Sequence, residues 1–68
     1  MMTMGQKIRN KRLERDLTQG ELAQLSGVSK SMICYLEKDL RVPTSDKLKR
    51  IAKVLRCSMD YICNDKAG

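Results

Sequence analysis

The sequence predicts an all-α protein, a compact arrangement of five short helices in a chain of 68 residues. Apolar residues recur at helical spacing, and no segment shows the sustained alternation of a strand. Residues that favour helix N-termini stand in front of several of these stretches. The chain has no Trp or Phe, so its core is expected to consist of aliphatic side chains, which suits short packed helices. This length has room for one domain, residues 1–68, and little room for a deep catalytic pocket.

The first two helices are predicted on either side of a break at residues 16–17. Residues 4–15 are rich in strong helix formers. Thr18 is followed three residues later by Glu21, the capping-box pattern that begins a helix. Gly27 ends this second helix, because glycine tolerates the left-handed conformation of a C-terminal cap.

A third helix is predicted to begin almost at once. Only two residues separate the end of the second helix from Ser29, a good N-cap for a helix over 30–38. Two short helices joined so tightly must cross steeply, which predicts a helix-turn-helix over about residues 18–38. The loop that follows, 39–43, contains Pro43, which bars helix continuation.

The last two helices are also marked by capping residues. Thr44 or Ser45 caps a predicted helix over 46–55, whose apolar residues recur at helical spacing. Ser58 caps a final short helix that reaches Cys63.

The outward face of the third helix carries groups suited to the edges of DNA bases. Ile33 and Leu36 form its inner side, while the opposite face is small, polar, aromatic or cationic. Such a helix fits the major groove, although an ordinary solvated helix with one half-buried tyrosine is the alternative. The residues predicted to contact bases are Lys30, Ser31, Cys34 and Tyr35.

Charge supports a polyanionic partner without proving one. The chain has 14 Lys and Arg against 8 Asp and Glu, a formal net charge of +6, and solubility alone also explains this excess. Lys49, Arg50 and Lys53 are expected to be solvated charges on the outer face of the fourth helix. Backbone N–H groups at helix N-termini suit phosphates. The residues predicted to contact phosphates are Gln19, Ser29, Lys38, Arg41 and Thr44.

Arg12 and Glu37 are predicted to form a structural ion pair. Arg12 lies four residues after Ile8, on the face of the first helix that should meet the core. Glu37 lies on the inner side of the third helix, and a charge in such a place needs a partner. A bidentate pair would satisfy both side chains; the alternative is two separate surface charges.

No catalytic, cofactor or metal site is predicted. The three cysteines are widely spaced and no histidine accompanies them, so neither a disulfide framework nor a zinc site is indicated. Motifs for a phosphate loop or paired catalytic carboxylates are missing, and no small-molecule ligand is expected. No apolar run approaches the length of a membrane span, so a cytoplasmic protein without a membrane partner is expected.

Several motifs together resemble the lambda-repressor-like helix-turn-helix family of Cro and XRE type regulators. The motifs are TQxELA at 18–23, Gly-Val-Ser at 27–29, Ile33 and Tyr-Leu-Glu at 35–37, Pro43, and the closing pattern 55–62. The resemblance covers nearly the whole chain. It departs at Asp39-Leu40, where family members often have Asn-Gly, and at Cys34, an unusual groove-facing residue.

The resemblance implies a five-helix domain that binds operator DNA as a dimer. It also implies that residues matching Gln19 and Lys38 touch phosphates and that Arg12 pairs with Glu37. The apolar residues of the last helix exceed what so short a helix can bury, so Met59, Tyr61 and Ile62 are predicted to form a homodimer interface.

Two functions from different classes remain open. The first is a sequence-specific regulator of transcription, a repressor that binds double-stranded DNA at a palindromic operator. The second is a protein-interaction module, antitoxin-like or co-activator-like, that uses the same fold chiefly to bind another protein. The salt dependence of DNA binding separates the two.

Overall fold

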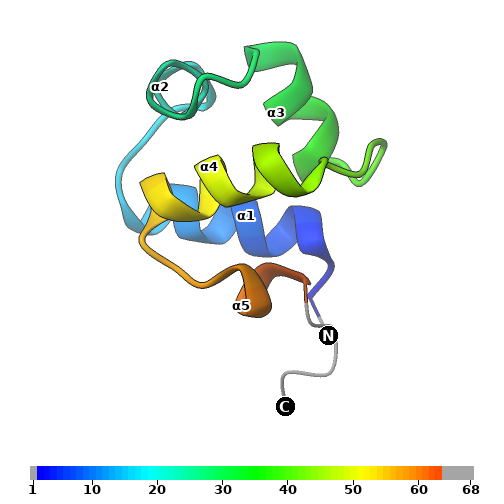
Figure 1. Ribbon diagram of the computed structural model, residues 1–68. Helices are drawn as coiled ribbons and strands as arrows, with labels where there is room; N and C mark the ends of the chain where they lie inside the picture. Colours follow the sequence, from blue (N-terminus) through cyan, green and yellow to red (C-terminus); the bar gives the residue numbers. More distant parts are fainter. Residues whose placement is uncertain (1, 64–68) are drawn as a thin grey trace.

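The computed structural model describes residues 2–63, and these residues form five helices and no strand, as predicted (Figure 1). The helices are α1 Met4–Glu14, α2 Gln19–Ser26, α3 Lys30–Glu37, α4 Ser45–Leu55 and α5 Met59–Cys63. The predicted first and third helices each extend one residue too far, and the fourth begins one residue too late. Thr44, rather than Ser45, is the N-cap of α4.

The helices are arranged around α1 and α4, which lie next to each other in the middle of the molecule (Figure 1). On one side α2 packs against α3 and α4, and α3 packs in turn against α1. On the other side α5 packs against α1 and α4. The α2–α3 pair therefore has an outer face that no other helix within residues 2–63 covers.

All five helices and the α2–α3 turn contribute apolar side chains to one core. Its buried members are Ile8, Leu22, Val28, Ile33, Leu36, Leu48, Ile51, Ala52, Leu55 and Ile62. Burying a side chain of this kind stabilises a fold by about 1.5–3 kcal/mol. The aliphatic core expected from the composition is therefore present.

The position of Ile62 corrects the prediction that this residue belongs to a dimer interface. Its side chain is 0% exposed, so it is not available to the dimer interface for which it was proposed. Helix α5 has only five residues, and Ile62 is the position by which this short helix enters the core. Met59 and Tyr61 remain half-buried against the same core.

Every helix begins at a side-chain cap. The hydroxyls of Thr3, Thr18, Ser29, Thr44 and Ser58 each accept a hydrogen bond from the backbone N–H three residues later. Such a cap is worth about 1 kcal/mol. At α2 the capping box is complete, because the Thr18 N–H donates to the Glu21 carboxylate at 2.8 Å. The matching box between Thr3 and Gln6 at α1 follows the same sequence pattern and was not predicted.

The start of α1 lies directly against the end of α3. A Cβ atom on Gly5 would lie 2.7 Å from the Glu37 carbonyl oxygen and would also collide with that of Leu36. Asp39, which follows α3, accepts hydrogen bonds from the Gly5 N–H at 2.9 Å and from the Thr3 hydroxyl at 2.6 Å. Asp39 has a φ of 60°, a conformation that Asp adopts more readily than most residues. Asp39, the first residue of the Asp39-Leu40 departure from the family pattern, thus holds the two helix ends together.

Gly5→Ala should therefore destabilise the protein by about 1–3 kcal/mol, because the added methyl group would collide with backbone atoms of α3, which can shift only by straining the helix. Gly20→Ala is the matched control, since the nearest atom to its added Cβ is 3.9 Å away. This second change should stabilise α2 by about 0.4–1 kcal/mol. Urea unfolding followed by circular dichroism measures both, and equal effects of the two changes would contradict the close approach at Gly5.

Candidate nucleic-acid interface

The turn between α2 and α3 is fixed by local hydrogen bonds and one buried side chain. Gly27 has a φ of 76° and its N–H donates to the Ala23 carbonyl at 2.9 Å. The Ser26 hydroxyl donates to the Leu22 carbonyl at 2.7 Å and accepts from the Val28 N–H at 3.3 Å. Val28 is buried in the core. The turn therefore sets the direction in which α3 leaves α2.

The four residues predicted to contact bases lie together on the outer face of this pair of helices. Ser31 and Lys30 are exposed, Cys34 is half-buried, and Tyr35 is 43% exposed. With Gln19 of α2 they line a shallow cavity of about 230 Å³. The opposite face of α3 is buried, as the sequence predicted. This arrangement gives a helix that is anchored on one side and presents a polar and aromatic surface on the other.

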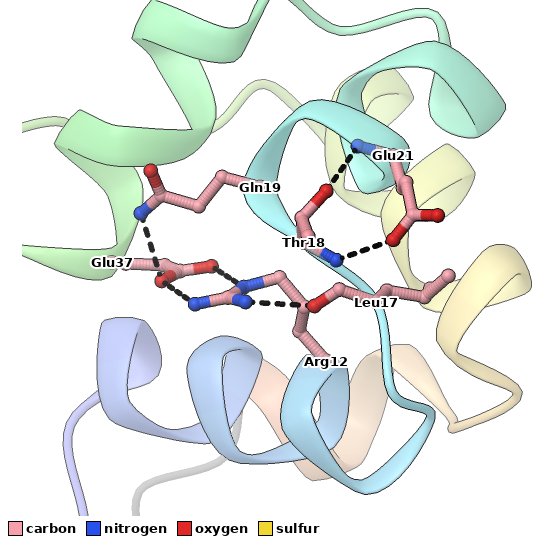
Figure 2. A network of polar contacts seen from close by, with 6 residues as sticks. All are labelled: Arg12, Leu17, Thr18, Gln19, Glu21 and Glu37. Atoms are coloured by element: carbon pink, nitrogen blue, oxygen red, sulfur yellow. Dashed lines mark hydrogen bonds and ion pairs between the residues drawn. The ribbon is translucent and has the colours of Figure 1, made fainter.

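The expected pair between Arg12 and Glu37 forms, and it is the centre of a larger network (Figure 2). The Arg12 guanidinium donates to both carboxylate oxygens of Glu37, at 2.7 and 3.0 Å, and to the Leu17 carbonyl at 2.8 Å. The Gln19 side-chain amide donates to the same carboxylate at 3.2 Å. Side-chain exposure is 10% for Arg12 and 3% for Glu37.

The network joins α1, the start of α2 and the end of α3 through one buried carboxylate. The hydrogen bond from Glu37 raises the pKa of Arg12, against the opposing effect of desolvation. Gln19 was predicted as a phosphate contact. In this structure its amide holds Glu37, while its backbone N–H lies in the first turn of α2, where N–H groups have no intrahelical partner.

The other predicted phosphate contacts are exposed residues at or near the ends of α3 and α4. Ser29 and Thr44 are exposed capping residues at the N-termini of α3 and α4. Lys38 is the exposed C-cap of α3, and Arg41 is exposed in the loop that follows. The Arg41 guanidinium carbon lies 5.8 Å from the centroid of the Tyr35 ring, within the range of a cation–π interaction. Sequence reasoning did not find this contact, because residues six apart across a helix end do not meet by periodicity.

Lys7 contributes to the net positive charge of the chain but is not part of an exposed basic surface. It is 7% exposed, its ammonium donates to the Tyr61 carbonyl at 3.1 Å, and it lies 5.3 Å from the Tyr61 ring centroid. Lys11 lies 5.0 Å from the same ring. Both contacts hold α5 against α1.

The described cysteines are free thiols. Cys57 is half-buried, and desolvation raises the pKa of its thiol, whereas Cys63 is exposed. Within residues 2–63 no group of three or more His, Cys, Asp or Glu side chains is placed to hold a metal ion. Nor is any helix of this part of the chain long and apolar enough to cross a membrane.

A capped helix, a glycine turn and a second capped helix with a polar outer face define a helix-turn-helix domain. The helix-turn-helix family model HTH_3 matches residues 8–62 of the chain. The chain therefore belongs to this helix-turn-helix family.

The relatives found by sequence comparison are named repressors and transcriptional regulators, which agrees with the prediction that the chain is no enzyme. The immunity repressor of Bacillus phage phi105 is 34% identical over 96% of this chain, and repressor C2 of Salmonella phage P22 is 34% identical over 87%. The regulator SinR of Bacillus licheniformis is 33% identical over 93%. The chain spans 45%, 27% and 58% of the lengths of these proteins, respectively.

Solved structures share the whole fold. The P22 c2 repressor in complex with a synthetic operator has a TM-score of 0.88 and 32% identity, over 91% of this chain and 94% of that one. SinR in complex with DNA has a TM-score of 0.85 and 31% identity, over 88% of this chain and 97% of that one. The predicted five-helix fold of lambda-repressor type is thereby confirmed.

Glu37→Ala should destabilise the fold by about 3–5 kcal/mol, because it leaves the Arg12 guanidinium buried without its acceptor. The double change Arg12→Met with Glu37→Leu removes both charges and retains apolar volume, so it should be more stable than the single variant. Thermal and urea unfolding of the three proteins measures this. A single-variant cost below about 1 kcal/mol, or a double variant less stable than Glu37→Ala, would contradict the buried network.

Proposed function

We propose that the chain is a sequence-specific, double-stranded DNA-binding regulator of transcription, a repressor that binds a palindromic operator as a homodimer. The observation that carries the proposal is the outer face of α3, where four side chains able to contact base edges gather beside the N-terminus of α2. An α-helix fits the major groove of B-DNA, and the N-terminal residues of the second helix of such a motif reach the bases.

Each side chain on this face has a chemically distinct use. Lys30 donates to the acceptors of guanine, and the Ser31 hydroxyl donates or accepts at either kind of base. Cys34 makes a small apolar contact, and Tyr35 stacks on a thymine methyl or reaches a phosphate. The Arg41 guanidinium lies over the Tyr35 ring, 5.8 Å from its centroid, and supplies a positive charge for a DNA phosphate.

Phosphate contacts set the register of α3 in the groove. The first turn of α2 offers N–H groups and the positive end of the helix dipole, with Gln19 at the same place. Ser29 and Thr44 expose hydroxyls at two further helix starts, and Lys38 and Arg41 supply positive charge. The P22 c2 repressor and SinR, which share this fold, have been crystallised with operator DNA and with DNA, which supports the proposal.

A second copy of the chain would give the two-fold symmetry of a palindrome. Met59 and Tyr61 of α5 are the half-buried apolar residues that we propose for this contact. Ile62 contributes indirectly, since its burial fixes the position of α5.

The alternative is a module whose main partner is another protein. It is favoured by one observation: the complex of SinR with SinI contains a chain with the same fold, with a TM-score of 0.90 at 30% identity over 96% of this chain. Such a module would bind duplex DNA weakly and without sequence preference.

Selection of bound sequences from random duplexes tests the proposal. At physiological salt we expect enrichment of a palindrome whose half-sites lie about one helical turn apart. Ser31→Ala and Tyr35→Ala should each lower the preference at one position by roughly tenfold, the size of one base contact. Gln24→Ala, at an exposed position of α2 outside the cavity, is the control and should leave the site unchanged. A lack of enrichment would favour the protein-interaction module.

Lys38→Gln should weaken binding to every duplex to a similar degree, because a phosphate contact carries no sequence information. The slope of log K against log salt should fall in magnitude by about 0.9 for each protomer bound, one phosphate contact being lost. Lys49→Gln, on the outer face of α4, should not change the slope. Fluorescence anisotropy over a salt series provides the measurement, and an unchanged slope for Lys38→Gln would remove Lys38 from the interface.

A further inference from the structure

A second shallow cavity lies where α1, α2 and α4 come to their ends. In Figure 1, α1 and α4 end on the same side of the molecule, below α2. The cavity has a volume of about 460 Å³ and is lined chiefly by Arg15, Arg50, Lys53 and Arg56 around Leu25 and Val54. It shares no lining residue with the cavity on α3.

The charge of this cavity is strongly positive. Its lining has four cationic side chains and no carboxylate. One carboxylate lies nearby, because Asp46 accepts from Arg50 at 3.2 Å in an exposed pair. The C-terminal ends of three helices each contribute roughly half a negative charge, and together with Asp46 they offset about two and a half of the four cations. A positive surplus remains that no described acidic side chain neutralises.

The lining of the cavity includes apolar side chains, which distinguishes it from a simple basic patch. Leu25 is 62% exposed, and Val54 is half-buried beside it. A single exposed leucine is common on protein surfaces. Here Leu25 and Val54 line the same cavity as arginine and lysine side chains, whose aliphatic stems extend apolar surface, so the cavity offers both parts of an amphipathic binding site.

We propose that this cavity is a docking site for an acidic segment of a partner protein that carries a leucine-like side chain. The partner's carboxylates would pair with Arg15, Lys53 and Arg56. The two arginines can each bind a carboxylate through two parallel hydrogen bonds. The partner's apolar side chain would cover Leu25. A DNA backbone supplies negative charge but no such side chain, so the apolar lining residues favour an acidic peptide. The site is independent of DNA binding, since it leaves the outer face of α3 free.

The test uses a short synthetic peptide with acidic residues on both sides of two central leucines. A second peptide has serine in place of the leucines and the same charge. Titration of the 15N-labelled protein should shift the amide signals of Leu25, Lys53 and Arg56. Fluorescence anisotropy should show that the serine peptide binds at least about fivefold more weakly, the effect of removing one apolar contact.

Lys53→Glu and Lys49→Glu form a matched pair for this site. They make the same change of charge on exposed positions of α4, and only Lys53 lines the cavity. Lys53→Glu should weaken peptide binding by about fivefold or more, beyond any loss caused by Lys49→Glu, and Leu25→Ser should weaken it as well. Neither lysine change should alter the DNA site selected from random duplexes.

Three results would overturn the proposal. Equal weakening by the two lysine changes would indicate general attraction by net charge. Equal binding of the leucine and serine peptides would remove the role of Leu25. A loss of DNA binding specific to Lys53→Glu would make the cavity part of the DNA interface.

Discussion

The buried pair between Arg12 and Glu37 is the interaction on which the geometry of the remaining structure depends. Both side chains are nearly buried, with exposures of 10% for Arg12 and 3% for Glu37, so each charge is tolerable only while the other is in place. The pair links α1 to α3, and the hydrogen bond from the Gln19 side chain to Glu37 extends this link to the start of α2. A replacement by apolar side chains would preserve packing but not this directional link. The pair therefore acts mainly by fixing the orientation of α3 against the N-terminus of α2.

A second set of contacts fixes the same, C-terminal end of α3 against the start of α1. The end of α3 lies so close to the start of α1 that only glycine fits at position 5. Asp39, in a left-handed conformation, closes this junction by accepting from Thr3 and Gly5. The loop with Arg41 then begins from a fixed point, and Arg41 returns over Tyr35. Two sets of contacts thus hold the C-terminal end of the helix that is proposed to contact DNA.

The sequence was sufficient for nearly all of the fold because each helix carries its own start signal. Four of these signals are local patterns that the sequence shows directly: Thr18 with Glu21, Ser29, Thr44 and Ser58. The apolar spacing of α4 likewise identifies its buried side without reference to other helices. The ion pair was also predictable, since a charge at a core position of α1 required a partner. The pattern Thr-x-x-Gln at 3–6 was equally legible and was missed.

What the sequence could not give were contacts between segments distant in the chain. Asp39 meets residues more than thirty positions away, and nothing in its local pattern indicates α1 as its partner. Lys7 reads as a surface charge because its position in α1 does not reveal that α5 covers it. Ile62 reads as surplus apolar surface for the same reason, whereas tertiary packing makes it part of the core.

In the proposed complex, the outer face of α3 contacts base edges while the N-termini of α2 and α4 contact phosphates of the DNA backbone. Nuclear Overhauser contacts between the labelled protein and its selected duplex test this most directly. Contacts from Ser31 and the Tyr35 ring to major-groove base protons, with amide shifts at the first turns of α2 and α4, are the predicted result. Contacts confined to α5 or to the cavity lined by Arg15 and Lys53, with the α3 face unaffected, would contradict the account.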